Sequence, residues 1–196
     1  MDGGSAFRRS FHLASPVFLG YYLVPDDLGA GLTKTAVTLL FLGTAWCIEM
    51  ARMALGLRLI GMRAYEGQRV SAYAQGSVGL AFALFVIGDP RIVIPVFVGM
   101  AWIDPLAHLA RKRGWSRAVP AGVYAALFLA ASALIEPAYG GFPPTIRLLF
   151  AAVATVTAIA VEGPFLHQLD DDLLMQAVPM TILAGLAYAV AAYGLL

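Results

Sequence analysis

The stretch RIVIPVFVGMAWIDPLAHLARKR, residues 91–113, decides the fold class of this chain. Its apolar part, residues 92–110, lies between the turn-like Gly88-Asp89-Pro90 and the basic Arg111-Lys112-Arg113. A helix rises 1.5 Å per residue, so about 20 residues span the roughly 30 Å hydrocarbon core of a bilayer. The stretch therefore predicts a transmembrane helix with a polar turn at one end and cations at the other.

Six further apolar runs are separated by short polar turns, and they lie near residues 11–24, 28–48, 70–87, 118–135, 146–161 and 173–196. Of the 196 residues, 60% are apolar and 13% are charged, and the mean hydropathy is +0.78. This balance is far from that of a soluble protein. We expect one all-α domain over residues 1–196, a polytopic membrane helix bundle with about seven transmembrane helices. Six spans are the alternative, because the first and sixth runs are short.

Basic residues are unevenly divided between the two sets of loops. Alternating the loops along the chain puts ten of the thirteen on one side, which the positive-inside rule makes cytoplasmic. We therefore expect a cytoplasmic N-terminus, a first run that is retained and not cleaved as a signal peptide, and a C-terminus outside. The ten are Arg8, Arg9, Arg52, Arg58, Arg63, Arg69, Arg111, Lys112, Arg113 and Arg117, and the other three are Lys34, Arg91 and Arg147.

Composition and motifs exclude several classes of function. The net charge is +1 and the basic residues form no single stripe, so no nucleic-acid partner is expected. The one cysteine, Cys47, excludes a disulfide framework or a cysteine zinc site within one chain. The chain has no phosphate-binding GxxxxGK[ST] loop, no GxGxxG element and no soluble-kinase catalytic loop.

Carboxylates gather on the same side as the arginines. They are Glu49, Glu66, Asp104, Glu162 and the run Asp170-Asp171-Asp172. Arginines contact phosphate oxygens and carboxylates hold Mg²⁺, so this face is suited to a metal–nucleotide complex. The alternative for the aspartate run is an acidic loop without a metal, in which Asp172 caps the last helix.

Asp104 is the sharpest single candidate, because it interrupts an apolar run at a depth where an ionisable group is costly. Pro105 disfavours the helical conformation at Asp104 and predicts a break in the helix there. The alternative is an aspartate at a helix end that faces water.

Two other groups have simpler alternatives. Arg8, Arg9 and His12 at the start of the first run also suit an interfacial anchor. Glu49 and Arg52 are three residues apart on one helical face, which also suits an ion pair within the helix.

Taken in order, these motifs resemble those of the diacylglycerol/polyprenol kinase family, which includes dolichol kinase, phytol kinase and the CTP-dependent diacylglycerol kinase. The motifs are Arg8-Arg9-x-x-His12, Glu49-x-x-Arg52, Arg63-x-x-Glu66, Asp104-x-x-Ala107 and Glu162-(x)7-Asp170-Asp171-Asp172-Leu173. The resemblance covers residues 8 to about 180. Arg111 departs from it, because it stands where that family has glycine.

The resemblance implies transfer of a phosphoryl group from CTP, with Mg²⁺, to the hydroxyl of a polyprenol-type or dolichol-type alcohol or of diacylglycerol. The site would lie at the cytoplasmic membrane surface, among membrane lipids. The implied roles are base or metal ligand for Asp104, metal ligands for Asp170 and Asp171, and nucleotide contacts for Arg8, Arg9, His12, Arg52 and Arg63, with Glu66 as a catalytic residue that orients an arginine. The alternatives are a membrane cytidylyltransferase that makes a CDP-lipid, and a small transporter with Asp104 on its path.

Overall fold

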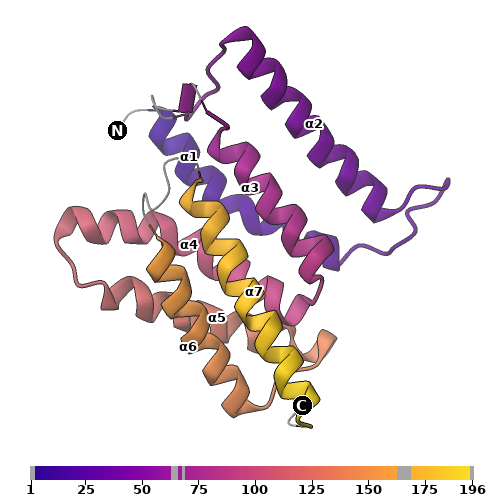
Figure 1. The fold of residues 1–196 in the computed structure, drawn as a ribbon, viewed down its shortest axis with the longest axis vertical. Helices are drawn as coiled ribbons and strands as arrows, with labels where there is room; N and C mark the ends of the chain where they lie inside the picture. The colour runs from indigo at the N-terminus through magenta and orange to yellow at the C-terminus, as the bar shows by residue number, and fades with distance from the viewer. Residues whose placement is uncertain (1–2, 63–65, 68, 163–168, 195–196) are drawn as a thin grey trace.

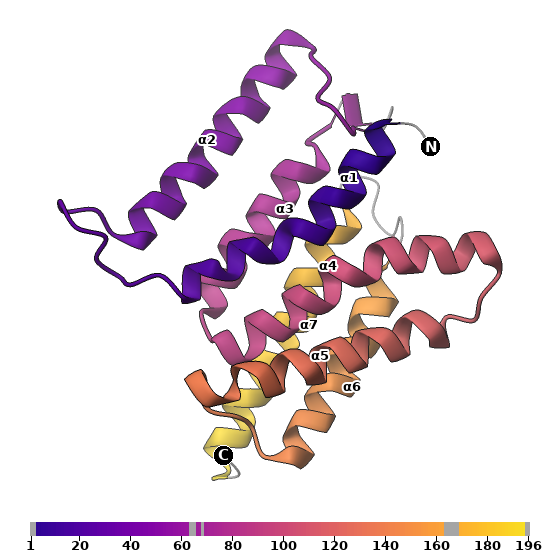
Figure 2. The ribbon, with the colours of Figure 1, turned by 180° about the vertical axis from the view of Figure 1, so that it is seen from behind.

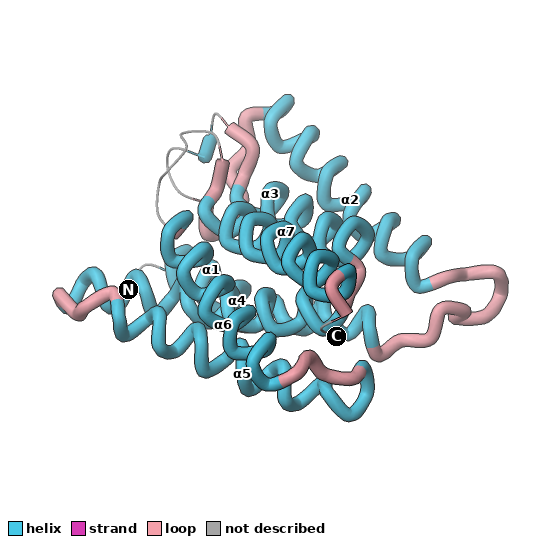
Figure 3. Tube along the Cα trace, turned by 60° about the horizontal axis from the view of Figure 1, so that its bottom comes forward, coloured by secondary structure: helices cyan, strands magenta, loops and turns pink. Residues whose placement is uncertain are grey.

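The computed structural model describes residues 3–62, 66–67, 69–162 and 169–194. The chain is all-helical, with 80% helix and no strand in the described ranges (Figure 3). The helices are α1 (Gly3–Ala14) with a 3₁₀ extension, η1 (Ser15–Tyr22); α2 (Lys34–Leu55); α3 (Ala72–Ala81) with a π-helical extension, η3 (Phe82–Ile87); α4 (Pro90–Arg113); α5 (Ala118–Tyr139); α6 (Pro144–Val161); and α7 (Asp171–Ala192).

Five of these helices, α2, α4, α5, α6 and α7, are long and apolar enough to cross a membrane. The two remaining apolar runs fall on composite segments, α1 with η1 and α3 with η3. The composition and these five helices together indicate a membrane protein.

Capping side chains and glycines fix where the helices begin and end. The side chains of Thr33, Ser71 and Asp89 accept hydrogen bonds from backbone N–H groups in the first turns of α2, α3 and α4. Gly56 and Gly114 end α2 and α4 in the left-handed conformation, which glycine adopts without steric cost.

The bounds of α2 differ from the apolar run expected at residues 28–48. The helix starts later, at Lys34, because residues 29–31 have positive φ and an isolated bridge joins Asp27 to Thr33. It ends later, at Leu55, because its last turns carry the polar pair Glu49 and Arg52 inside the protein.

The break expected at Asp104 is wrong, because α4 continues through both Pro95 and Pro105. A proline inside a helix removes one backbone hydrogen bond. In membrane helices, neighbouring helices and local adjustment compensate for that loss.

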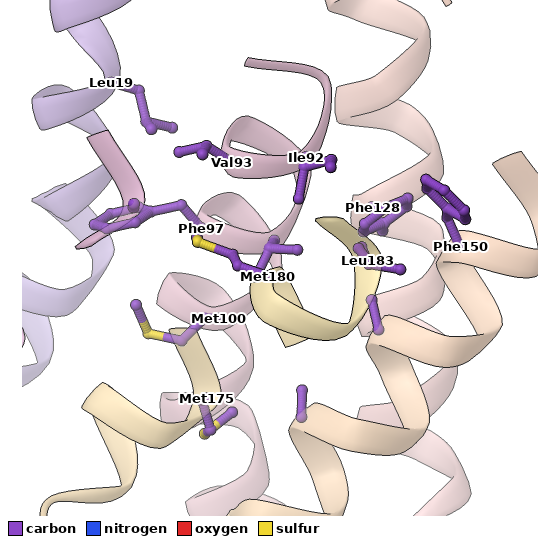
Figure 4. Packing of buried hydrophobic residues seen from close by; sticks show 14 of the residues in the cluster. Leu19, Ile92, Val93, Phe97, Met100, Phe128, Phe150, Met175, Met180 and Leu183 are labelled. Carbon is purple, nitrogen blue, oxygen red and sulfur yellow. The ribbon is translucent and has the colours of Figure 1, made fainter. Parts of the chain in front are cut away.

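The core forms where α4 packs on α5 and α7, and where α6 packs on α7. Phe97 and Met100 of α4 lie by Met180 of α7, and Phe128 of α5 lies by Phe150 (Figure 4). The helix α2 stands apart from this bundle in both ribbon views (Figures 1 and 2) and contacts chiefly α3. Its long apolar side chains are therefore mostly exposed.

The molecule has two unlike ends. At one end, which we call the paired end, each of three cations lies beside a carboxylate. Lys34 Nζ is 2.9 Å from Asp26 Oδ1, Arg91 Nη2 is 2.8 Å from Asp89 Oδ2, and Arg147 Nη2 is 2.8 Å from Glu136 Oε2. At the other end, which we call the charged end, α1, α3 and α7 begin and α2 and α4 finish. The candidate site lies at the charged end.

Candidate functional site

A buried group of charged and polar side chains lies at the charged end, and we call it the polar cluster. It consists of Arg8 and His12 of α1, Glu66, Arg69, and Asp170 and Asp172 at the start of α7. The polar cluster brings together residues that are about 60 to 160 positions apart in the sequence. Of the residues for which the sequence predicts a role in the site, the structure brings together Arg8, His12, Glu66 and Asp170.

Arg8 is the centre of the polar cluster. Its Nη1 donates to Glu66 Oε1 at 2.9 Å, and its Nη2 lies 3.8 Å from Asp170 Oδ1 and 3.6 Å from Asp172 Oδ2. Arg8 is 9% exposed and Glu66 is fully buried. One guanidinium therefore joins carboxylates from two distant parts of the chain, out of bulk water.

His12 and Arg69 flank this centre on either side. His12 lies one helical turn after Arg8, on the same face of α1, and its Nε2 is 3.4 Å from Asp172 Oδ2. The Nη2 of Arg69 donates to Asp170 Oδ2 at 3.5 Å. Three basic side chains thus face two carboxylates of α7 and one at position 66.

The start of α7 is held by a hydrogen bond to Gln75 of α3. The backbone N–H of Asp170 donates to Gln75 Oε1 at 2.6 Å, and Gln75 Nε2 donates to the carbonyl of Val70 at 3.2 Å. Asp170 Oδ1 accepts from the Asp172 N–H at 3.3 Å and so caps the helix. The alternative in which Asp172 caps the last helix is wrong, because Asp170 is the cap and Asp172 is the second residue of α7.

Glu49 and Arg52 form a separate closed network, which we call the clamp. Arg52 donates to both Glu49 oxygens, at 2.8 and 2.7 Å, and to the carbonyls of Leu57 and Arg69, at 3.5 and 2.8 Å. Glu49 also accepts from the N–H and hydroxyl of Ser71, at 2.7 and 2.9 Å. Arg52 is 1% exposed, so in this arrangement it positions the segment after α2 and does not present its guanidinium to a nucleotide.

Other predicted site residues are less fully placed. Arg63 lies outside the described residues. Asp104 lies in α4, four residues after Met100, and its side chain is outside the described part of the chain. Arg9 is half-buried and lies about 100° around α1 from Arg8. Asp171 is the first residue of α7 and is half-buried.

The sequence interpretation gave no role to Ser71, Gln75 or Gln176, and it counted Arg69 only among the cytoplasmic basic residues. A signal was available for two of them, because Ser71 and Gln75 are polar residues four apart at the start of an apolar run. That spacing puts both on one face of a helix. Polar residues on a buried face need hydrogen-bond partners, so the pattern predicts partners for them on another element.

An apolar cavity of about 450 Å³ lies beside α2 and ends at the polar cluster. Its polar lining comes from Arg8, His12, Ser15, Glu49, Ser71, Ser77, Asp172 and Gln176, and the rest is mainly aromatic and aliphatic. Gln176 is 2% exposed, and its Oε1 has no hydrogen-bond partner among the described residues. Exposed lining residues, among them Phe11, Phe41 and Ile48, show that the cavity opens to the surroundings of the helices.

Carboxylates at the start of α7 could hold a metal ion. One oxygen from each of Asp170, Asp171 and Asp172 lies within 4.8 Å of the others. Oxygen ligands of this kind suit Mg²⁺, which usually takes one or two protein carboxylates together with phosphate oxygens and water. Arg8 and Arg69 neutralise part of the negative charge of Asp170 and Asp172 in this structure. A metal ion would therefore share these carboxylates with the two arginines.

A further ion pair joins the ends of α4 and α6 near the site. Arg111, in the last turn of α4, contacts the Glu162 carboxylate that follows α6. Arg111, which departs from the kinase-family pattern, therefore pairs with Glu162, which is part of that pattern.

No family model, curated protein or solved structure matches the chain. The likeness to the kinase family therefore rests on the ordered motifs alone, and the function that it implies is a proposal.

Proposed function

We propose that this protein is a lipid kinase, which transfers a phosphoryl group from a Mg²⁺-bound nucleotide, CTP in the first instance, to the hydroxyl of a lipid alcohol. The observation that carries the proposal is the position of the polar cluster at the end of an apolar cavity. A lipid alcohol has the same division, with an apolar chain and one polar end.

Phosphoryl transfer depends mainly on positioning and on neutralising charge. Arg8, Arg9 and Arg69 supply cations for phosphate oxygens, and Arg63 is assigned the same role from its motif. Asp170 and Asp171 would hold Mg²⁺, and the ion would neutralise the charge on the phosphates. Glu66 orients Arg8 through their 2.9 Å hydrogen bond. Asp104, by its motif, is the base for the alcohol or a further metal ligand.

We further propose that the chain crosses the membrane seven times, with the charged end on the cytoplasmic side. Ten of thirteen basic residues then lie in the cytoplasm, where the nucleotide is available. The concentration of charge at one end favours an interfacial enzyme over a transporter, which needs polar groups along its path through the membrane.

The test is an assay of the purified protein in lipid nanodiscs, with labelled CTP or ATP, Mg²⁺, and a panel of prenols and diacylglycerol. A kinase releases a nucleoside diphosphate and forms a lipid phosphate, whereas a cytidylyltransferase releases pyrophosphate. Asp171→Asn should lower kcat roughly 100-fold, the scale of losing one positioned catalytic group. Asp26→Asn, at the paired end, is the control and should keep wild-type turnover. Absence of both nucleotide products with every alcohol would reject the proposal.

A further inference from the structure

The cavity is charged at one end and mainly apolar along the rest of its length, where the hydroxyls of Ser15 and Ser77 donate to carbonyls of their own helical segments. Its first side runs along α1 and η1 from Arg8 to Phe18, its second along α2 from Glu49 to Phe41, and its third along α3 from Ser71 to Leu80. These intervals are eight to ten residues, so the sides are roughly 12–17 Å long at rises of about 1.5 Å per residue in the α-helices and about 2.0 Å in the 3₁₀ helix η1. Arg8, Glu49 and Ser71, at the charged end, are the starting points of the three sides.

Two aromatic rings lie at the apolar end of the cavity. The ring centroids of Phe18 and Phe41 are 5.5 Å apart with an interplanar angle of 41°. Phe18 comes from η1 and Phe41 from α2, so this contact bridges the two sides of the cavity at the end farthest from the polar cluster.

The volume fits one hydrocarbon chain. If a heavy-atom group takes about the 30 Å³ of a water molecule, 450 Å³ holds roughly 15 groups. That is enough room for one chain of moderate length with its hydroxyl. The carboxylate of Asp172 and the amide oxygen of Gln176 line the cavity near its polar end and can accept a hydrogen bond from a hydroxyl.

We propose that this cavity binds the chain of a single-chain alcohol, with the hydroxyl at His12 and Asp172, and that the Phe18–Phe41 pair limits the length of chain that it holds. The assignment of an alcohol rests on the proposed function. Binding of the chain requires no nucleotide and can be measured separately.

Gly76 allows the cavity to be blocked without disturbing the fold. It lines the cavity within α3, and a methyl group added there would meet no described atom within 4 Å. Gly122 of α5 has the same open surroundings but does not line the cavity. Leucine is a better helix former than glycine, so both Gly76→Leu and Gly122→Leu should fold.

The experiment is photolabelling of the full chain in lipid nanodiscs, with a primary alcohol of about twelve carbons that carries a diazirine at its far end. Mass spectrometry should find the label near Phe18 and Phe41, and unlabelled alcohol in excess should remove it. Gly76→Leu should lower this labelling at least tenfold, and Gly122→Leu should leave it unchanged. Labelling spread over the exposed apolar helices, or unaltered in Gly76→Leu, would overturn the proposal.

Chain length and chain number are tested with the same readout. Phe41→Ala should let a probe of about sixteen carbons label the far end of the cavity several-fold better than in the wild type. Leu40→Ala, its exposed neighbour outside the cavity, should not. If diacylglycerol and the single-chain alcohol, at the same mole fraction, reduced the photolabelling equally, the single-chain assignment would be refuted. Labelling without phosphorylation would reject the kinase alone, and phosphorylation without labelling would reject the cavity alone.

Discussion

At the scale of single residues, Arg8 has the largest electrostatic role in the site. It lies near three carboxylates, and the closest, Glu66, is fully buried. A buried ion pair contributes little compared with an apolar pair of the same shape, but removing one partner leaves a charge without compensation. Arg8 and Glu66 should therefore depend on each other more than on their surroundings.

A double-mutant cycle tests this dependence. Arg8→Gln should destabilise the protein by up to about 3–5 kcal/mol, because it leaves the buried Glu66 carboxylate behind. Glu66→Gln should cost less, because Arg8 keeps Asp170 and Asp172 within 3.8 Å. The double variant should be more stable than the sum of the two losses predicts, with a coupling of about 1–3 kcal/mol. Thermal unfolding in detergent gives the values. Strictly additive losses would show that the two side chains do not act as a pair.

At the scale of elements, the clamp connects α2 to the rest of the protein. The helix packs on the bundle over little of its surface, yet Arg52 joins it to Leu57 and Arg69, and Glu49 joins it to Ser71. The segment that the clamp holds carries Glu66 and Arg69 into the polar cluster. The clamp is therefore a positioning device for the site, and its geometry depends on the planar fork of arginine.

Arg52→Lys keeps the charge, but an ammonium group cannot make all four hydrogen bonds that the Arg52 guanidinium donates to Glu49, Leu57 and Arg69. We expect faster amide hydrogen exchange in residues 57–71 and a melting temperature several degrees lower. Arg91→Lys is the matched control, since Arg91 also forms a forked pair, with Asp89, but is about one-third exposed at the paired end. It should have a smaller effect. The clamp would lose its assigned role if exchange in residues 57–71 were the same in Arg52→Lys and the wild type.

The positions of the helices could be predicted from the sequence because each apolar run has flanking polar turns. The expected break at Asp104 was wrong because a proline effect that ends helices in water is compensated by packing inside a bundle. Arg8, Glu66 and Asp170 lie together in the structure. The family resemblance placed them in one site only because their motifs follow the same order along the chain, and no local pattern specified their contacts. The cavity could not be predicted, since it exists only because α2 stands apart, which no local pattern specifies. The pairing of Gln75 with Asp170 likewise depends on how α3 and α7 pack.

At the scale of the whole molecule, the two sides differ in how many basic residues they carry. Each of the three cations at the paired end has a carboxylate within 2.9 Å, whereas the alternation of the loops along the sequence assigns the other ten of the thirteen basic residues to the opposite side. This difference supports the proposed orientation in the membrane.

Single cysteines in a Cys47→Ala background test that orientation. Cysteines at the exposed positions Ile60 and Arg113 should react with an impermeant thiol reagent only from the cytoplasmic side. Cysteines at Asp27 and Glu136, at the paired end, should react only from the other side. Labelling of both pairs from one side would contradict the alternation of the helices.

The pairing at that end also has a consequence for insertion under a membrane voltage. In the proposed orientation, Lys34, Arg91 and Arg147 cross to the outer side against an inside-negative potential. Each unpaired cation would require about 2.3 kcal/mol of electrical work per 100 mV, or roughly 7 kcal/mol for the three. A cation that crosses together with its carboxylate carries no net charge, so the field does almost no work on the pair. Translocation of the loops with Arg91 and Arg147 should therefore depend little on the voltage across the membrane. The loop with Lys34 also carries Asp27, so its net negative charge should be helped outward by an inside-negative potential.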